Sequence, residues 1–109
     1  MLKGIDPILS PELLMHLSAM GHGEWVAVVD ANFTANYLSQ GKPVVRLPGI
    51  SLERASQAVL SVFPLDSAVI QPAAYMKVCD MPDSHRTDAQ NAVVKLLAKE
   101  GVKLEQVEP

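Results

Sequence analysis

Residues 25–29 read Trp-Val-Ala-Val-Val, an uninterrupted apolar run between Glu24 and Asp30. A short, valine-rich run of this kind is typical of a strand covered on both faces, as in the middle of a parallel sheet. The polar segment 30–43 follows and predicts an irregular loop. Residues 44–47 then predict a short strand that ends at a Pro48-Gly49 turn.

Helices are predicted on both sides of these strands. Ser10-Pro11-Glu12 predicts a helix start, because serine caps free N–H groups, proline suits the first turn and glutamate complements the helix dipole. Gly21 is expected to end this helix in the left-handed conformation. Ser51 predicts the start of a second helix, which Pro64 stops, and Ser84 predicts the start of a third, which Gly101 closes.

Two further strands are predicted, one within 68–79 and one over 102–107. Strands that alternate with helices predict an α/β fold, a single layered domain with a mostly parallel central sheet flanked by helices. The 109 residues are enough for one domain over 1–109 and leave no room for two independent cores.

Composition excludes several classes of function. Nine Lys and Arg against twelve Asp and Glu give a net charge of −3, so a nucleic-acid or membrane-surface binder is not expected. The single cysteine, Cys79, excludes an internal disulfide framework and a cysteine zinc site, and we expect it to be a small buried apolar residue. No apolar run could span a bilayer and no signal-peptide core is visible, which predicts a cytoplasmic protein.

His22 is the candidate proton-transfer residue. It lies between Gly21 and Gly23, which remove side-chain bulk on both sides and allow close approach of a ligand. Imidazole is the side chain that gains and loses a proton near neutral pH. A turn residue behind a glycine cap is an equally good interpretation of the same pattern, and the residues alone leave both open.

Asp30 is the candidate ligand-binding carboxylate. It follows the run 25–29, and ligands of open α/β sheets bind outside the carboxyl ends of the strands. The alternative is an Asx-type turn formed by Asp30 with Asn32, and this too stays open. His16 and His85 are interpreted as ordinary helix residues on or near the solvated face. No phosphate loop, dinucleotide fingerprint or zinc-hydrolase motif is present.

Several segments together resemble the L-fucose mutarotase / D-ribose pyranase (RbsD/FucU) family. They are residues 6–14 (Asp-Pro-Ile-Leu-Ser-Pro-Glu-Leu-Leu), 20–23 (Met-Gly-His-Gly), 30–33 (Asp-Ala-Asn-Phe) and 63–66 (Phe-Pro-Leu-Asp). The last of these is more similar to the fucose branch. The resemblance implies an RbsD-like fold, interconversion of cyclic forms of free monosaccharides, no metal or organic cofactor, and ring-like homo-oligomers, often decamers.

The resemblance also implies roles for individual residues. His22 matches the general acid histidine and Asp30 the sugar-binding aspartate, while Asn32 and Phe33 are expected to line the sugar. Asp30 follows His22 by eight positions, and extended chain covers about 3.3–3.6 Å per residue. Unless the turn at residues 21–23 folds back, the two side chains cannot reach one sugar, which favours a site shared between neighbouring subunits.

The chain departs from the family pattern after residue 107. The resemblance implies an Arg-Phe-Ala-Phe-Tyr-like segment, a further strand and a glycine-rich ending, whereas this chain stops at Glu108-Pro109. We therefore expect a domain truncated at its carboxyl end. The function expected is an L-fucose-type mutarotase working by general acid–base catalysis. The alternatives are a D-ribose pyranase, a non-catalytic sugar-binding or transport-accessory protein, and a structural subunit without a working site.

Overall fold

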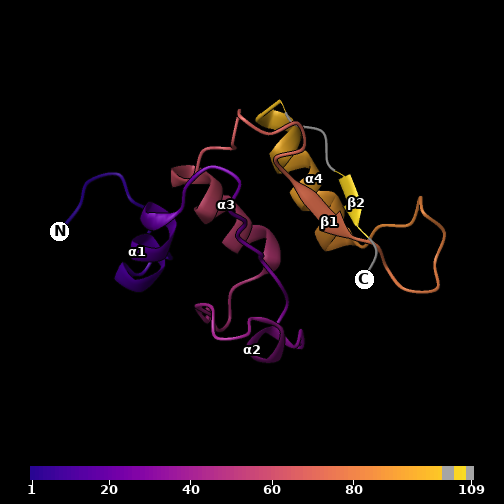
Figure 1. Cartoon of the computed structure of the whole chain (residues 1–109), viewed down its shortest axis with the longest axis horizontal. Coiled ribbons are helices and arrows are strands. Elements are labelled where there is room, and N and C mark those ends of the chain that lie inside the picture. The colour runs from indigo at the N-terminus through magenta and orange to yellow at the C-terminus, as the bar shows by residue number, and fades with distance from the viewer. Residues whose placement is uncertain (102–104, 108–109) are drawn as a thin grey trace. The chain divides into compact units, whose positions relative to one another are not determined.

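The computed structural model describes residues 1–101 and 105–107 (Figure 1). The elements along the chain are α1 (Pro11–Ala19), α2 (Ala35–Leu38), α3 (Leu52–Val62), β1 (Ala74–Met76), α4 (Asp88–Lys99) and β2 (Glu105–Val107). They fall into two units. The first, Met1–Pro64, holds α1, α2 and α3, and the second, Leu65–Pro109, holds β1, α4 and β2. The expectation of one domain over 1–109 stays a prediction.

The first predicted helix is confirmed as α1. The Ser10 hydroxyl accepts a hydrogen bond from the Leu13 N–H at 3.2 Å, and Pro11 occupies the first turn. Glu12 adds a negative charge where the dipole is positive. The helix ends at Ala19, and the Met20 N–H donates to the Leu17 carbonyl. Leu13 and Leu17 form its buried face.

The second predicted helix is confirmed as α3. The Ser51 hydroxyl accepts from the Arg54 N–H at 3.1 Å, which satisfies one of the free donors of the first turn. The helix stops at Val62, and Phe63 is the capping residue directly before Pro64. This position agrees with the steric bias of residues before proline toward extended backbone.

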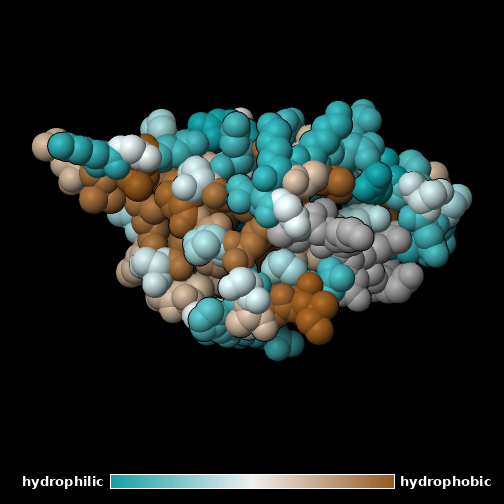
Figure 2. Space-filling model, turned by 90° about the horizontal axis from the view of Figure 1, so that it is seen from above, coloured by the Kyte–Doolittle hydropathy of each residue, from teal (hydrophilic) through white to brown (hydrophobic). Residues whose placement is uncertain are grey.

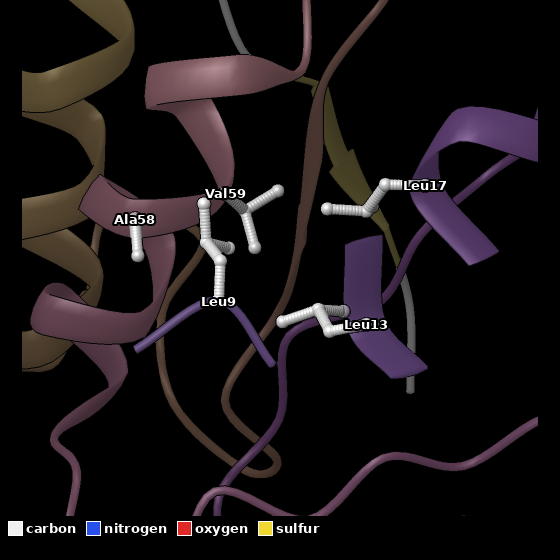
Figure 3. Packing of buried hydrophobic residues seen from close by; sticks show 5 residues of the cluster. All are labelled: Leu9, Leu13, Leu17, Ala58 and Val59. Carbon is white, nitrogen blue, oxygen red and sulfur yellow. The ribbon is translucent and has the colours of Figure 1, made fainter. Parts of the chain in front are cut away.

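One hydrophobic cluster forms the core of the first unit (Figure 3). It joins α1, the segment before it and α3, and consists of Leu9, Leu13, Leu17, Ala58 and Val59. Ala58 is fully buried. Half-buried apolar residues surround the cluster, among them Ile5, Ile8, Leu14, Met20, Val26, Val45, Leu47, Val62 and Phe63. The packing of α1 against α3 therefore organises this unit.

An ion pair ties the start of the chain to α3. The Arg54 guanidinium donates two hydrogen bonds to the Asp6 carboxylate, at 2.6 and 2.8 Å. The same carboxylate accepts from the Ile8 N–H at 3.0 Å, and the Asp6 carbonyl accepts from the Leu9 N–H at 2.9 Å. The hydrogen bonds from Arg54 and Ile8 lower the pKa of Asp6, and the hydrogen bond to Asp6 raises the pKa of Arg54. Asp6 thus fixes the turn that leads into α1.

The strands predicted over 25–29 and 44–47 are wrong for the described residues. Neither segment is helix or strand, although Val26, Val45 and Leu47 pack against the core cluster. A strand needs a neighbouring backbone for its ladder, and no described segment supplies one to residues 25–29 or 44–47. The apolar pattern therefore marks some residues that pack against the core cluster, but it overstates their burial, since Trp25 and Val29 are exposed, and it fails to predict hydrogen-bonded pairing. The loop predicted over 30–43 also contains the single-turn helix α2.

The second unit contains a parallel strand pair and a helix. β1 pairs with β2 in the register Ala74↔Glu105, Tyr75↔Gln106 and Met76↔Val107. These strands fall within the predicted ranges 68–79 and 102–107, of which residues 102–104 lie outside the described residues. Helices and a parallel pair are thus present, but a larger central sheet is absent from the residues the structure describes.

The predicted start of the third helix at Ser84 is wrong. Helix α4 begins at Asp88 behind Thr87, whose hydroxyl accepts from the Gln90 N–H at 3.1 Å while the Gln90 side chain accepts from the Thr87 N–H at 2.9 Å. This reciprocal capping box satisfies two free donors at once, which a lone serine cap does not. Gly101, at φ 75°, follows the helix end as expected.

Candidate functional site

His22 lies on a four-residue turn that follows α1. The Glu24 N–H donates to the Gly21 carbonyl at 3.3 Å, and the Gly21 N–H donates to the Glu24 carboxylate at 2.8 Å. Two hydrogen bonds therefore link the first and last residues of the turn, one through the backbone and one through a side chain. His22 is solvent-exposed at the second position of this turn.

The two glycines beside His22 have different roles. Gly23 has φ 80°, a left-handed conformation that a residue with a Cβ adopts only with strain. Gly21 is not among the left-handed residues, so the expectation that Gly21 ends α1 in that conformation is wrong. The extended Met20 caps the helix instead, and the chain reverses later, at Gly23. No heavy atom lies within 4 Å of a Cβ built on either glycine, so the space on both sides of His22 is open.

Asp30 opens a second turn, eight positions after His22. Its carboxylate oxygen Oδ1 accepts from the Asn32 N–H at 2.8 Å, and its carbonyl accepts from the Phe33 N–H at 3.2 Å. The Asx-type turn considered for Asp30 is therefore present. Within the part of the chain that the structure describes, the second carboxylate oxygen, Oδ2, makes no hydrogen bond. One oxygen of this exposed carboxylate thus holds the turn and the other is available to a ligand.

The structure brings three of the four predicted site residues onto this second turn. Asn32 is exposed and Phe33 is half-buried, and the N–H of each donates to Asp30, from Asn32 to the carboxylate and from Phe33 to the carbonyl. His22 lies on the separate earlier turn. The sugar-binding roles of Asp30, Asn32 and Phe33 and the proton-transfer role of His22 stay predictions, because no ligand geometry tests them.

The sequence did not predict the structural role of Glu24 or the exposure of Trp25, two residues that follow the His22 position closely. The Glu24 carboxylate closes the turn that carries His22. The sequence indicates this role only through the presence of a polar side chain three positions after Gly21. Trp25 was predicted as part of a covered strand, yet its side chain is 64% exposed. It is the chain's one tryptophan, so its fluorescence reports on the neighbourhood of the His22 turn.

His16, His85 and Cys79 are the other side chains considered in the sequence analysis. His16 in α1 is half-buried, and His85 is half-buried in a turn before α4, its N–H donating to the Pro82 carbonyl at 2.9 Å. Cys79 is exposed, so its prediction as a buried residue is wrong, because it lies in the irregular segment after β1. Within the described ranges 1–101 and 105–107, no three His, Cys, Asp or Glu side chains gather as a metal site.

The second unit has a shallow hollow of about 390 Å³. Its walls come from the segment after α3 and from Gly101, which follows α4. The lining residues are Leu65, Asp66, Ser67, Val69, Ile70, Gln71, Pro72 and Gly101. None of the four predicted site residues lines it.

Apolar side chains also remain on the surface of the first unit. The larger ones outside the amino-terminal segment are Met15, Trp25, Val29, Tyr37, Leu38 and Ile50. Figure 2 shows hydrophobic surface interleaved with polar side chains on one face of the molecule. None of the helices among the described residues is long and apolar enough to cross a membrane.

Curated proteins similar to this chain are fucose mutarotases. The chain is 46% identical over 76 residues to fucose mutarotase from Mus musculus, which is 69% of this chain and 50% of that protein. It is 44% identical over 80 residues to L-fucose mutarotase from Haemophilus influenzae (strain ATCC 51907 / DSM 11121 / KW20 / Rd), which is 73% of this chain and 54% of that protein. The chain therefore spans about half the length of the curated relatives it matches.

A solved structure shares the fold. It is the crystal structure of a protein provisionally described as sugar-binding, with a TM-score of 0.85 and 35% identity, covering 99% of this chain and 75% of that chain. The profile of the RbsD / FucU transport protein family matches residues 3–109, nearly the whole sequence. The chain belongs to the RbsD / FucU transport protein family.

Proposed function

We propose that this protein is an isomerase that accelerates the interconversion of the α and β anomers of a free monosaccharide such as L-fucose. The observation that carries this proposal is the identity of 44–46% to fucose mutarotases over about 70% of the chain. The exposed His22 turn supplies a side chain suited to the chemistry.

The reaction requires two proton transfers. Opening the sugar ring adds a proton to the ring oxygen and removes one from the anomeric hydroxyl, which leaves an open-chain aldehyde. Rotation about the bond next to the aldehyde exposes its other face, and ring closure reverses both transfers. His22 is proposed as the acid that donates to the ring oxygen and recovers the proton on closure, a contribution of about 10²–10⁴-fold.

Asp30 is proposed to hold the sugar. Its Oδ1 is occupied by the Asn32 N–H, so Oδ2 is the oxygen that would accept a hydrogen bond from a sugar hydroxyl. Asn32 and Phe33 on the same turn are proposed to line the sugar, the first through its exposed amide and the second through its ring. Neither a metal nor an organic cofactor takes part in the proposed chemistry.

The assembled protein is proposed to be a cytoplasmic ring of identical subunits, often a decamer in this family, with sites shared between neighbours. Membership of the RbsD / FucU family supports this proposal. We also propose that the complete fold has a mostly parallel central sheet, which the parallel pairing of β1 with β2 supports. Light scattering tests the assembly, and a monodisperse, fully active monomer contradicts it.

Saturation-transfer NMR on L-fucose tests the activity. The protein is expected to raise the exchange rate between the α and β anomer signals in proportion to its concentration, at a fixed pH and buffer concentration. Parallel measurements on D-ribose separate a mutarotase from a pyranase, since the latter accelerates exchange between pyranose and furanose signals. Unchanged exchange of both sugars contradicts the proposal.

A non-catalytic sugar-binding protein is the second candidate. It is favoured by the similarity to a structure provisionally described as sugar-binding. This candidate predicts saturable binding of L-fucose, measured as a change in Trp25 fluorescence, without faster anomer exchange.

A further inference from the structure

The carboxylate of Glu24 closes the turn that carries His22. The Gly21 N–H donates to Glu24 Oε2 at 2.8 Å, and the Glu24 N–H donates back to the Gly21 carbonyl at 3.3 Å. His22 and Gly23 are enclosed between these two bonds. The turn is therefore held by a reciprocal pair, in which the shorter bond comes from the side chain.

This side-chain bond matters because the two glycines beside His22 make the backbone of the turn conformationally permissive. Glycines on both sides give it more accessible conformations than any other residue type would. No heavy atom lies within 4 Å of the positions where their Cβ atoms would be, so the space at those two points is open. Proton transfer depends on placing the imidazole within hydrogen-bond reach of the reacting oxygen. A loose turn would spread His22 over many positions.

We propose that Glu24 is a positioning residue for His22: its carboxylate selects the one turn conformation from which the imidazole can reach the sugar. This inference rests on the proposed function. Glu24 acts through the backbone of Gly21 and does not touch the sugar. It should therefore affect the turnover of bound sugar more than the binding of sugar.

Two substitutions separate the hydrogen bond from the charge. Glu24→Ala removes the acceptor, whereas Glu24→Gln keeps an amide oxygen that can accept from the Gly21 N–H. Glu12→Ala is the matched control, because it removes another exposed carboxylate of the same unit that holds no turn. Urea unfolding of each variant shows whether the fold is retained.

The kinetic test measures kcat and KM for L-fucose anomer exchange. Glu24→Ala is expected to lower kcat about fivefold, as the loss of one exposed hydrogen bond predicts, with KM within about twofold of wild type. Glu24→Gln and Glu12→Ala are expected to stay within about twofold in both parameters. A kcat of Glu24→Ala equal to that of wild type overturns the proposal. The proposal is also overturned if Glu24→Gln or Glu12→Ala loses as much kcat as Glu24→Ala.

An NMR test is independent of activity. In wild type, the His22 ring is expected to show one set of NOE contacts. Glu24→Gln is expected to keep those contacts and Glu24→Ala to lose them. If wild-type protein does not accelerate exchange between the L-fucose anomers but the NOE contacts of His22 behave as expected, the proposed function fails and the role of Glu24 in placing His22 stands. If the His22 contacts are unchanged in Glu24→Ala, the role of Glu24 is refuted whatever the activity.

Discussion

Leu17 links the core of the first unit to the turn that carries His22. Its side chain is 7% exposed and packs with Leu9, Leu13, Ala58 and Val59, and its carbonyl accepts the hydrogen bond from Met20 that ends α1. Leu17→Ala removes three buried carbon atoms at about 0.8 kcal/mol each. The cavity left behind adds to this, so the expected loss in free energy of unfolding is about 3 kcal/mol, within the range of about 2–5 kcal/mol for such changes.

Urea denaturation followed by circular dichroism measures this loss. With a slope of about 1.5 kcal/mol per molar urea, the unfolding midpoint should fall by about 2 M. Met15→Ala is the matched control, since Met15 lies in the same helix with its side chain 58% exposed. Its expected cost is below about 0.5 kcal/mol. Equal costs for the two substitutions would refute the assignment of Leu17 to the core.

Two further predictions concern the ion pair and the glycines. The hydrogen bond from Arg54 lowers the pKa of Asp6 in the folded protein below that of the unfolded chain. The ionised carboxylate therefore stabilises the fold fully above about pH 4, and this stabilisation is lost as the pH falls through the lowered pKa of folded Asp6. In thermal unfolding, the Tm of Asp6→Asn should depend less on pH in the acid range than the Tm of wild type. An unchanged dependence of Tm on pH would show that the ion pair contributes nothing to stability. Gly23→Ala should cost about 1–2 kcal/mol, because φ is 80° there, whereas Gly21→Ala should be neutral or stabilise by up to about 1 kcal/mol. Urea unfolding of the two alanine variants checks this, and equal stabilities would contradict the difference between the glycines.

Helix starts that depend on neighbouring residues were predictable. Ser10 and Ser51 each cap a helix through the N–H three positions later, a bond that the local sequence alone determines. The start of α4 was misplaced for an equally local reason. Ser84 looked like a cap, but Thr87 with Gln90 makes two bonds where a serine makes one.

Features that depend on distant segments were not predictable. Asp6 and Arg54 are 48 positions apart, and neither has a local signal for the other. Residues 25–29 have the composition of a central strand, yet a strand forms only where a second backbone lies alongside. The exposed Trp25 and the closing role of Glu24 follow from the conformation of that segment and turn.

The candidate site was predictable in part. The resemblance to a known family selected His22 and Asp30, and the structure gives each an exposed position on its own turn. Which glycine reverses the chain depends on φ, so Gly23 and Gly21 could not be told apart from composition. The Asx turn at Asp30 shows that a structural role and a proposed binding role can share one carboxylate, because each uses a different oxygen.

The measurement that tests the central claim most directly is L-fucose anomer exchange with His22→Ala beside His16→Ala. Both variants remove one imidazole from the first unit, and only His22 lies on the open turn. The account predicts that His22→Ala lowers the protein-dependent exchange rate by about 10²–10⁴-fold. It predicts that His16→Ala keeps the wild-type rate. Anomer exchange as fast with His22→Ala as with wild type would contradict the account.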